Sequence, residues 1–433
     1  MSADSKRPRP PGDGTAGGAG PTSLLLSHAR LADGRTVDVR LVGDRIEAVG
    51  TAGSLAPVTA GARVDLTGHL LLPAPAEPHA HADSALTADS PGPVPYGGEE
   101  VRRRATEAAL LQLGHGATAL RAHVRIGDDR GLGPLEAVLR VQGSLHGLGV
   151  LTPVAVPRLL GGAAGAEGRA LLREAVRRGA GAVGGRPDLD PDPAGHVAAV
   201  LEVAAEHGVP VDLHTEGDDP AWLARLAAMA DGLVPGVTIG PCAGLARLPS
   251  EVAGRAAERL AEAGVAVVCL PQGGCADAGA RDGGPRGVAP VGLLRAAGVR
   301  VAAGSGALRD AANPVGRGDP LEAAYLLASR GGLSPEEAYG AVSTEARAVM
   351  GLPEVRVEAG FPAELLAVRG ERLAGALSLA YSRIVVHRGR VVARTSAVRE
   401  YCDSAAALDL PRQARTRRPP EPGSPQAGPV VRS

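Results

Sequence analysis

The sequence contains few aromatic residues and few cysteines. Its 433 residues include one Trp, one Phe and five Tyr, so a pocket that grips a flat ligand by stacking has few candidate side chains. The four cysteines form no Cys-x-x-Cys pair. The chain therefore lacks the zinc-binding signature that combines His-x-Glu with Pro-Cys-x-x-Cys. Sparse, unpaired cysteines favour a reduced, cytoplasmic protein.

The sequence also lacks a charge imbalance and long apolar runs. The net charge is −1, and no long run of like charge interrupts the part that we expect to fold, so nothing suggests a nucleic acid or an anionic membrane surface as partner. The first residues are polar and rich in Pro and Gly, unlike a secretory signal, and no apolar run has transmembrane length.

Composition separates two polar ends from an ordered middle. Residues 1–22 and 410–433 are expected to be disordered tails. Short strands separated by turn sequences occur near both ends of the remaining chain. They are expected at 23–28, 37–42 and 45–49, and again at 363–368, 381–387 and 390–394. Packing the two sets together predicts one small β-sandwich, discontinuous in sequence, from residues 23–69 and 353–400.

Residues 70–352 alternate between apolar strand-like segments and helical patterns. Continuous apolar runs are typical of buried parallel strands. Strands are expected at 70–79, 118–124, 150–156, 181–184, 209–214, 236–240, 265–270 and 299–304. The clearest helical patterns cover 99–113, 166–178, 194–207, 249–263 and 320–329. Eight strands in this alternation predict an α/β fold, a (β/α)8 TIM barrel, rather than an open doubly wound sheet.

Two histidines, His79 and His81, mark the end of the first barrel strand. Residues two apart on a strand point to the same face, so both imidazoles can converge on one point. Neutral imidazole is a good ligand for zinc or iron. The alternative is a pair of polar residues in an ordinary loop after the strand.

His214 ends the fifth strand, and the C-terminal ends of barrel strands gather at one mouth. His79, His81 and His214 can therefore meet, and three imidazoles plus water are enough for a catalytic metal site. A buried, hydrogen-bonded histidine is the alternative for His214. Glu216, two residues later, is a candidate proton shuttle, although Glu-Gly-Asp-Asp also suits a solvated loop. His123, on the second strand, can approach the same pocket.

Several segments, in this order along the chain, resemble the amidohydrolase superfamily, and most closely its cytosine deaminase-like branch. The segment from Leu71-Leu72-Pro73 through His79-Ala80-His81-Ala82-Asp83 resembles the first metal motif. Arg121-Ala122-His123-Val124 and Asp212-Leu213-His214 resemble the second and fifth strands, and residues 309–322 resemble the segment after the eighth. The resemblance covers about residues 24–400.

This resemblance implies one divalent metal, zinc or iron, held by His79, His81 and His214. It implies hydrolysis of a non-peptide C–N bond in a small, often cyclic, amide or amidine, for example deamination of a pyrimidine-like ring. Arg158 stands where the branch often has a substrate-binding glutamine, so Arg158 and His123 are candidates to contact a small-molecule substrate. Barrels of this size often self-associate, so a homo-oligomer is also expected.

The chain departs from the family pattern at two positions that matter for the chemistry. Gly306 occupies the place of the strand-eight aspartate, which binds metal and accepts a proton, and Pro241 occupies the place of the strand-six histidine. Losing a general base costs about 10²–10⁴ in rate, and losing an oxyanion partner has a comparable cost. Asp310 lies four residues beyond Gly306. It could substitute for the aspartate only if the loop folded back, and we expect it instead to make a structural loop contact.

Two hypotheses follow from these features. In the first, the chain is a divergent metal-dependent hydrolase in which Glu216 moves protons. In the second, it is a non-catalytic member, a pseudoenzyme, that keeps the barrel and a ligand pocket in which Arg158 holds an anionic group. The losses at Gly306 and Pro241 favour the second hypothesis, and the three retained histidines favour the first.

Overall fold

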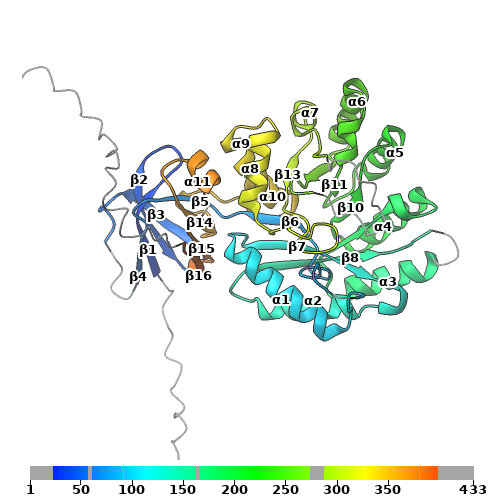
Figure 1. Cartoon of the computed structure of the whole chain (residues 1–433), viewed down its shortest axis with the longest axis horizontal. Helices are drawn as coiled ribbons and strands as arrows, with labels where there is room; N and C mark the ends of the chain where they lie inside the picture. The colour runs from blue at the N-terminus through cyan, green and yellow to red at the C-terminus, as the bar shows by residue number, and fades with distance from the viewer. Residues whose placement is uncertain are drawn as a thin grey trace, which may run out of the picture. The chain divides into compact units, whose positions relative to one another are not determined.

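The computed structural model describes residues 23–56, 61–90, 92–161, 165–273, 287–379 and 381–397. Both predicted disordered tails lie outside these residues. The described part forms two sheets, one within a ring of helices and one built from segments near the two ends of the chain (Figure 1). Among the described residues, no helix is both long and apolar enough to cross a membrane.

The larger sheet consists of eight parallel strands that pair in chain order. They are β6 Ala76–Ala80, β7 Ala119–Ile126, β8 Val150–Pro157, β9 Ala182–Gly185, β10 Val211–Thr215, β11 Val237–Pro241, β12 Ala266–Cys269 and β13 Val301–Ala303. A parallel bridge between Ala80 and Gly306 brings the last strand back to the first. The sheet is therefore a nearly closed barrel, which confirms the predicted (β/α)8 fold.

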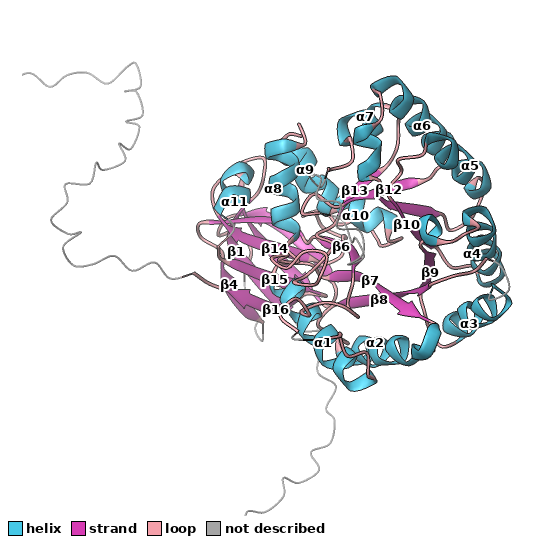
Figure 2. Ribbon diagram, turned by 45° about the vertical axis from the view of Figure 1, so that its right-hand side comes forward, coloured by secondary structure: helices cyan, strands magenta, loops and turns pink. Residues whose placement is uncertain are grey.

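Helices surround this barrel (Figure 2). They are α1 Gly98–Gly114, α2 Gly133–Ser144, α3 Gly165–Arg177, α4 Pro193–His207, α5 Pro220–Ala230, α6 Ser250–Glu262, α7 Val291–Ala296, α8 Pro320–Arg330, α9 Pro335–Val342 and α10 Thr344–Val349. Short 3-10 helices η1 Asp128–Arg130, η2 Pro187–Leu189 and η3 Ala243–Arg247 follow β7, β9 and β11. The apolar faces of helices and strands share one large core, because strands covered on both sides must be apolar throughout.

The second sheet combines segments from both ends of the chain. Its strands are β1 Ser23–Arg30, β2 Thr36–Val42, β3 Arg45–Thr51, β4 Ala62–Asp65, β5 His69–Pro73, β14 Leu365–Arg369, β15 Arg383–His387 and β16 Arg390–Thr395, with α11 Leu373–Leu379 between β14 and β15. The order is β16-β15-β14-β5-β1-β2-β3, and β4 pairs with β1. This sheet encloses a separate apolar core, so the discontinuous β-module is also confirmed.

One predicted strand is wrong, because the run expected at 70–79 is two strands in different sheets. β5 pairs with β14 in the terminal sheet, and β6 pairs with β7 in the barrel. The interruption is Pro73-Ala74-Pro75, where two prolines lack the N–H groups that a continuous ladder needs. The domain limits 23–69, 70–352 and 353–400 stay predictions.

A buried ion pair between Asp319 and Arg383 connects the barrel to the terminal sheet. Asp319, which caps the N-terminus of α8 through the backbone N–H of Leu321, receives two hydrogen bonds from Arg383 of β15 at 2.8 and 2.6 Å. Burial opposes ionisation of Asp319, but its bonds to Arg383 hold its pKa below the usual value. The carboxylate and the guanidinium therefore tie the terminal sheet to the segment after the last barrel strand.

Candidate metal centre

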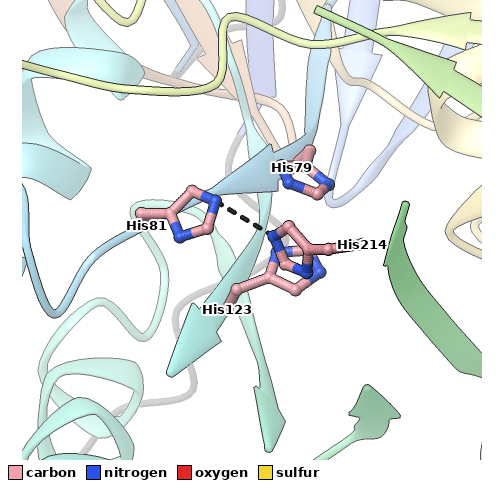
Figure 3. A group of neighbouring side chains, drawn as sticks. All are labelled: His79, His81, His123 and His214. Carbon is pink, nitrogen blue, oxygen red and sulfur yellow. Dashed lines mark hydrogen bonds between the residues drawn. The ribbon is translucent and has the colours of Figure 1, made fainter. Parts of the chain in front are cut away.

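Four histidines from three strands converge inside the barrel (Figure 3). His79 and His81 come from β6 and the residue just after it, His123 from β7 and His214 from β10. One ring nitrogen of each lies within 4.8 Å of the corresponding nitrogen of every other. Nε2 of His81 and Nε2 of His214 are 3.3 Å apart. The structure thus brings together the three histidines predicted as ligands, and it adds His123 to them.

The chemistry of these rings fits a metal ion. Burial is the main cause that lowers the pKa of His79, His81 and His214 well below the usual value, and the neighbouring imidazoles lower it further. Both ring nitrogens of His79, and Nδ1 of His123, are buried without a hydrogen-bond partner among the described residues. Buried polar atoms are normally paired, so a cation that accepts several neutral nitrogens would satisfy this arrangement.

A buried carboxylate, Asp212, lies directly behind the cluster. Its Oδ1 is 3.3 Å from Nε2 of His123 and 4.0 Å from Nδ1 of His79, and its Oδ2 accepts a hydrogen bond from Arg121 at 3.1 Å. Burial alone would raise the pKa of Asp212, but His123 and Arg121 hold it below the usual value. An ionised carboxylate behind two imidazoles can orient them and raise their basicity as ligands.

Glu77 lies one inward-facing position below His79 on β6 and closes the barrel beneath the cluster. One of its oxygens accepts the backbone N–H of His79 at 3.1 Å, and the other accepts both the backbone N–H of Ser305, at 2.8 Å, and the Ser305 hydroxyl. Burial raises the pKa of Glu77 to about 7 in spite of these bonds. These contacts join β6 to the end of β13 at the barrel's closure.

The two departures from the family pattern occupy buried positions, Gly306 just after β13 and Pro241 at the end of β11. Gly306 has φ +71°, and a Cβ there would lie 3.2 Å from Cδ1 of Leu270 and 3.3 Å from the carbonyl oxygen of Gly273. This left-handed conformation favours glycine. Pro241 is the last residue of β11 and pairs with Thr215. Neither residue places a titratable group near the histidines.

A cavity of about 250 Å³ lies over the histidine cluster. His81, His123 and His214 line it together with Arg125, Arg186 and the loop residues Asp310, Ala311 and Ala312. Oδ1 of Asp310 accepts the backbone N–H groups of Ala312 and Asn313, and its Oδ2 accepts the Ser84 hydroxyl at 3.3 Å. Asp310 therefore makes the expected loop contact, and it also presents a carboxylate to the cavity.

The other predicted site residues lie farther from the cluster. Glu216 follows β10, is half-buried, and donates its backbone N–H to Asp188 at 2.9 Å. Burial is the main cause that raises its pKa, and Asp188 and Asp218 add to the effect. Glu216 is not one of the described residues that line the cavity over the histidine cluster. Arg158 lines a neighbouring hollow of about 660 Å³ instead.

Sequence reasoning did not single out Asp212, Arg125, Arg186 or Tyr96. The first three could have been found from strand register, because Asp212 precedes His214 by two residues, Arg125 follows His123 by two, and Arg186 follows the fourth strand directly. Tyr96 comes from an irregular segment before α1, and its hydroxyl bonds Arg125. No periodic pattern could have placed it there.

Comparison with known proteins identifies the family. Residues 154–393, more than half of the chain, match the amidohydrolase family. A pterin deaminase of Rhizobium rhizogenes is 30% identical over 241 residues, which are 52% of this chain and 54% of that protein. The chain is thus aligned with only about half the length of that relative.

Solved structures share the fold over most of the chain. N-isopropylammelide isopropylaminohydrolase from Burkholderia multivorans matches with a TM-score of 0.75 and 28% identity, covering 87% of this chain and 100% of that one. 5-methylcytosine deaminase from Klebsiella pneumoniae matches with a TM-score of 0.74 at 22% identity, covering 88% and 100%. The predicted resemblance is therefore confirmed, and this chain belongs to the amidohydrolase family, in agreement with its cytosine deaminase-like branch.

Proposed function

We propose that the chain is a metal-dependent hydrolase of a non-peptide C–N bond in a small cyclic amide or amidine. The observation that carries this proposal is the convergence of four imidazoles, three of them buried, at the C-terminal mouth of the barrel, where enzymes of this fold carry out their chemistry. An unused barrel interior would gain more stability from apolar side chains than from four polar rings, several of whose nitrogens have no hydrogen-bond partner among the described residues.

His79, His81 and His214 would hold one zinc or iron ion, with His123 as a fourth nitrogen ligand. The four side chains supply ring-nitrogen donors that all lie within 4.8 Å of one another. Asp212 would keep His123 and His79 in place. When bound, the ion would act as a Lewis acid that activates water and polarises the carbon under attack.

A carboxylate at the mouth would accept the proton of the attacking water and return it to the departing nitrogen. Two residues are candidates for this role, Glu216 and Asp310. Asp310 shares the cavity wall with His81 and His214, whereas Glu216 lies beyond β10 next to Asp188. The cavity therefore supports Asp310 more strongly. It would fill the role that the family's strand-eight aspartate performs, which Gly306 cannot.

The relatives indicate which substrates to test first. One relative is named for pterin deamination and another for removal of an isopropylamino group from N-isopropylammelide. Both names describe C–N cleavage on a nitrogen-rich ring. The cavity wall formed by Ala311 and Ala312 leaves room for such a ring, since alanine fills little volume. Cytosine, pterin and N-substituted triazines are the first compounds to assay.

Metal content and turnover together test the proposal. The protein, purified without chelator, should contain about one zinc or iron per chain by elemental mass spectrometry. His79→Ala and His123→Ala should lose this metal, and His146→Ala, at an exposed position after α2, should keep it. Ammonia or amine release from the ring panel should accompany bound metal. A metal-free wild type would refute the proposal.

The non-catalytic alternative has its own support in the replaced positions Gly306 and Pro241. It predicts bound metal or ligand without release of ammonia or amine from any compound in the panel. Metal stoichiometry near one with no turnover would therefore favour a pseudoenzyme that keeps its pocket.

A further inference from the structure

Three arginines follow consecutive strands on one side of the barrel mouth. Arg125 lies near the end of β7, Arg158 directly follows β8, and Arg186 directly follows β9. Val154, Val156 and Ala182 pack together inside the barrel, and residues two apart on a strand share a face. Arg158 and Arg186 therefore continue the inward-facing rows of β8 and β9 at the mouth.

The histidine cavity and the neighbouring hollow share part of their walls. Arg125, Val156 and Arg186 line both. The hollow, of about 660 Å³, is also lined by Arg158 and Arg130. A small molecule can therefore extend from the histidines towards these arginines, because the combined space has the size of an ordinary ligand site.

Two of the four arginines are held firmly in place. Arg125 donates to Oδ2 of the buried Asp83 at 2.9 Å and also bonds the Tyr96 hydroxyl. The guanidinium of Arg130 lies 4.0 Å from the centre of the Tyr96 ring. A guanidinium that packing holds in position loses little entropy when it binds an anion.

Arginines outnumber acidic residues on these walls, and one of them, Arg125, is paired with the buried Asp83. Four arginines line the two spaces, and the acidic residues among the described lining residues are Asp128 and Asp310. Asp310 lines the histidine cavity but not the hollow that contains Arg158. Arg158 is 70% exposed and 3.6 Å from the partly exposed Asp128, a pair that water screens strongly. Its planar donors can therefore still bind an oxyanion.

We propose that the substrate carries an anionic group, a carboxylate or a phosphate, which Arg158 binds while its C–N bond lies over the histidine cluster. This inference rests on the proposed hydrolase function, and it adds a substrate class that the family and its relatives' names do not give. The positive charges of Arg125 and Arg130 would attract the anion, and their contacts with Tyr96 would hold that part of the wall in place.

Equilibrium binding tests this inference without any need for turnover. Metal-loaded wild type would be titrated with benzoate, phenylphosphonate and the neutral benzamide by isothermal calorimetry. We expect at least one of the two anions to bind saturably, at least tenfold more tightly than benzamide, and to weaken with added salt. A preference for benzoate or for phenylphosphonate identifies the anion as carboxylate-like or phosphate-like.

Variants locate the binding site. Arg158→Gln should weaken binding of the preferred anion by about fivefold, and Arg158→Glu by more, because it adds repulsion. Arg255→Gln is the matched control, since Arg255 on α6 is 67% exposed and pairs loosely with Glu251 at 4.0 Å. It should leave affinity unchanged.

Two outcomes overturn the inference while leaving the hydrolase proposal intact. Equal binding of benzamide and the anions would mean that charge does not select the ligand. Anion binding that survives Arg158→Glu but disappears in His79→Ala would place the anion on the metal instead. Absence of turnover in the metal-loaded protein would count against the hydrolase proposal alone, because the titration depends on neither ammonia release nor product.

Discussion

Oδ1 of Asp212 lies 3.3 Å from Nε2 of His123, and both groups are fully enclosed by the barrel. The same oxygen lies 4.0 Å from Nδ1 of His79, so the carboxylate is close to two histidines of the cluster. Asp212 does not line the cavity, but through its contact with His123 it can set the orientation of a side chain that does.

Replacing Asp212 by asparagine should weaken metal binding about 10- to 100-fold, because such supporting carboxylates orient their histidines and raise ligand basicity. Affinity can be measured by competition with a chelating dye. Asp231→Asn, at the exposed end of α5, is the control. Unchanged affinity in Asp212→Asn would show that the carboxylate only balances the charge of Arg121.

The two carboxylates proposed for proton transfer can be separated by amide substitutions. Asp310→Asn keeps an oxygen for the backbone N–H groups of Ala312 and Asn313, so the loop should survive while kcat falls by about 10² or more. Glu216→Gln should lower kcat less than tenfold. Steady-state kinetics on the substrate found in the screen decides the matter, and the reverse order would assign the role to Glu216.

Restoring the family's aspartate at position 306 has a structural cost. Gly306→Asp must place a side chain at φ +71° and close to Leu270, which should destabilise the protein by about 1–2 kcal/mol. Gly306→Ala, with the same backbone strain but no carboxylate, is the control for thermal unfolding and for metal affinity. Tighter metal binding in the aspartate variant than in the alanine variant would support the alignment with the family. Equal affinity would contradict it.

The buried pair between Asp319 and Arg383 predicts a large asymmetry between single and double variants. Arg383→Met should cost about 3–5 kcal/mol in urea unfolding, because it leaves a buried carboxylate without its partner. The double variant with Asp319→Asn should recover much of that loss, since asparagine still caps α8. Arg102→Met, which breaks an exposed pair with Glu99, should cost less than about 1 kcal/mol. Equal costs for the two arginines would contradict the buried pair.

Asp190 predicts an acid-dependent loss of stability. Burial opposes its ionisation, but backbone N–H groups of Asp192 and Leu160, together with His196, lower its pKa to about 2. A folded pKa below the unfolded value of 3.8 stabilises the protein above about pH 4, and this contribution of about 2 kcal/mol disappears as the pH falls towards 2. The difference in unfolding free energy between wild type and Asp190→Asn should therefore shrink from pH 5 to pH 2. A constant difference would contradict the low pKa.

The barrel was predictable because local sequence determines it. Each parallel strand is a short apolar run followed by a helix, and this alternation is visible without tertiary information. The prediction of one strand at 70–79 was wrong because apolar character does not indicate which sheet a strand joins. That choice depends on pairing with β14, almost 300 residues away in the sequence.

The centre was partly predictable for the same reason. The spacing of His79 and His81, and the strand-end position of His214, follow from strand periodicity. Whether His123 faces the metal or the substrate depends on how far β7 is shifted against β6, which the sequence does not reveal. The position of Asp310 is set by a loop that packs on Ser84, 226 residues earlier, and such long-range contacts leave no periodic trace.

The short link between β5 and β6 makes the terminal sheet part of the proposed catalytic apparatus. Only seven residues, 74–80, separate the last pairing with β14, at Pro73, from His81. A chain shortened to begin at β6 would therefore lose the anchor that fixes the height of its first two histidines. The terminal sheet and the barrel cannot be exchanged freely between relatives as independent modules, since a small change of angle at this junction would shift two donor nitrogens relative to the other two.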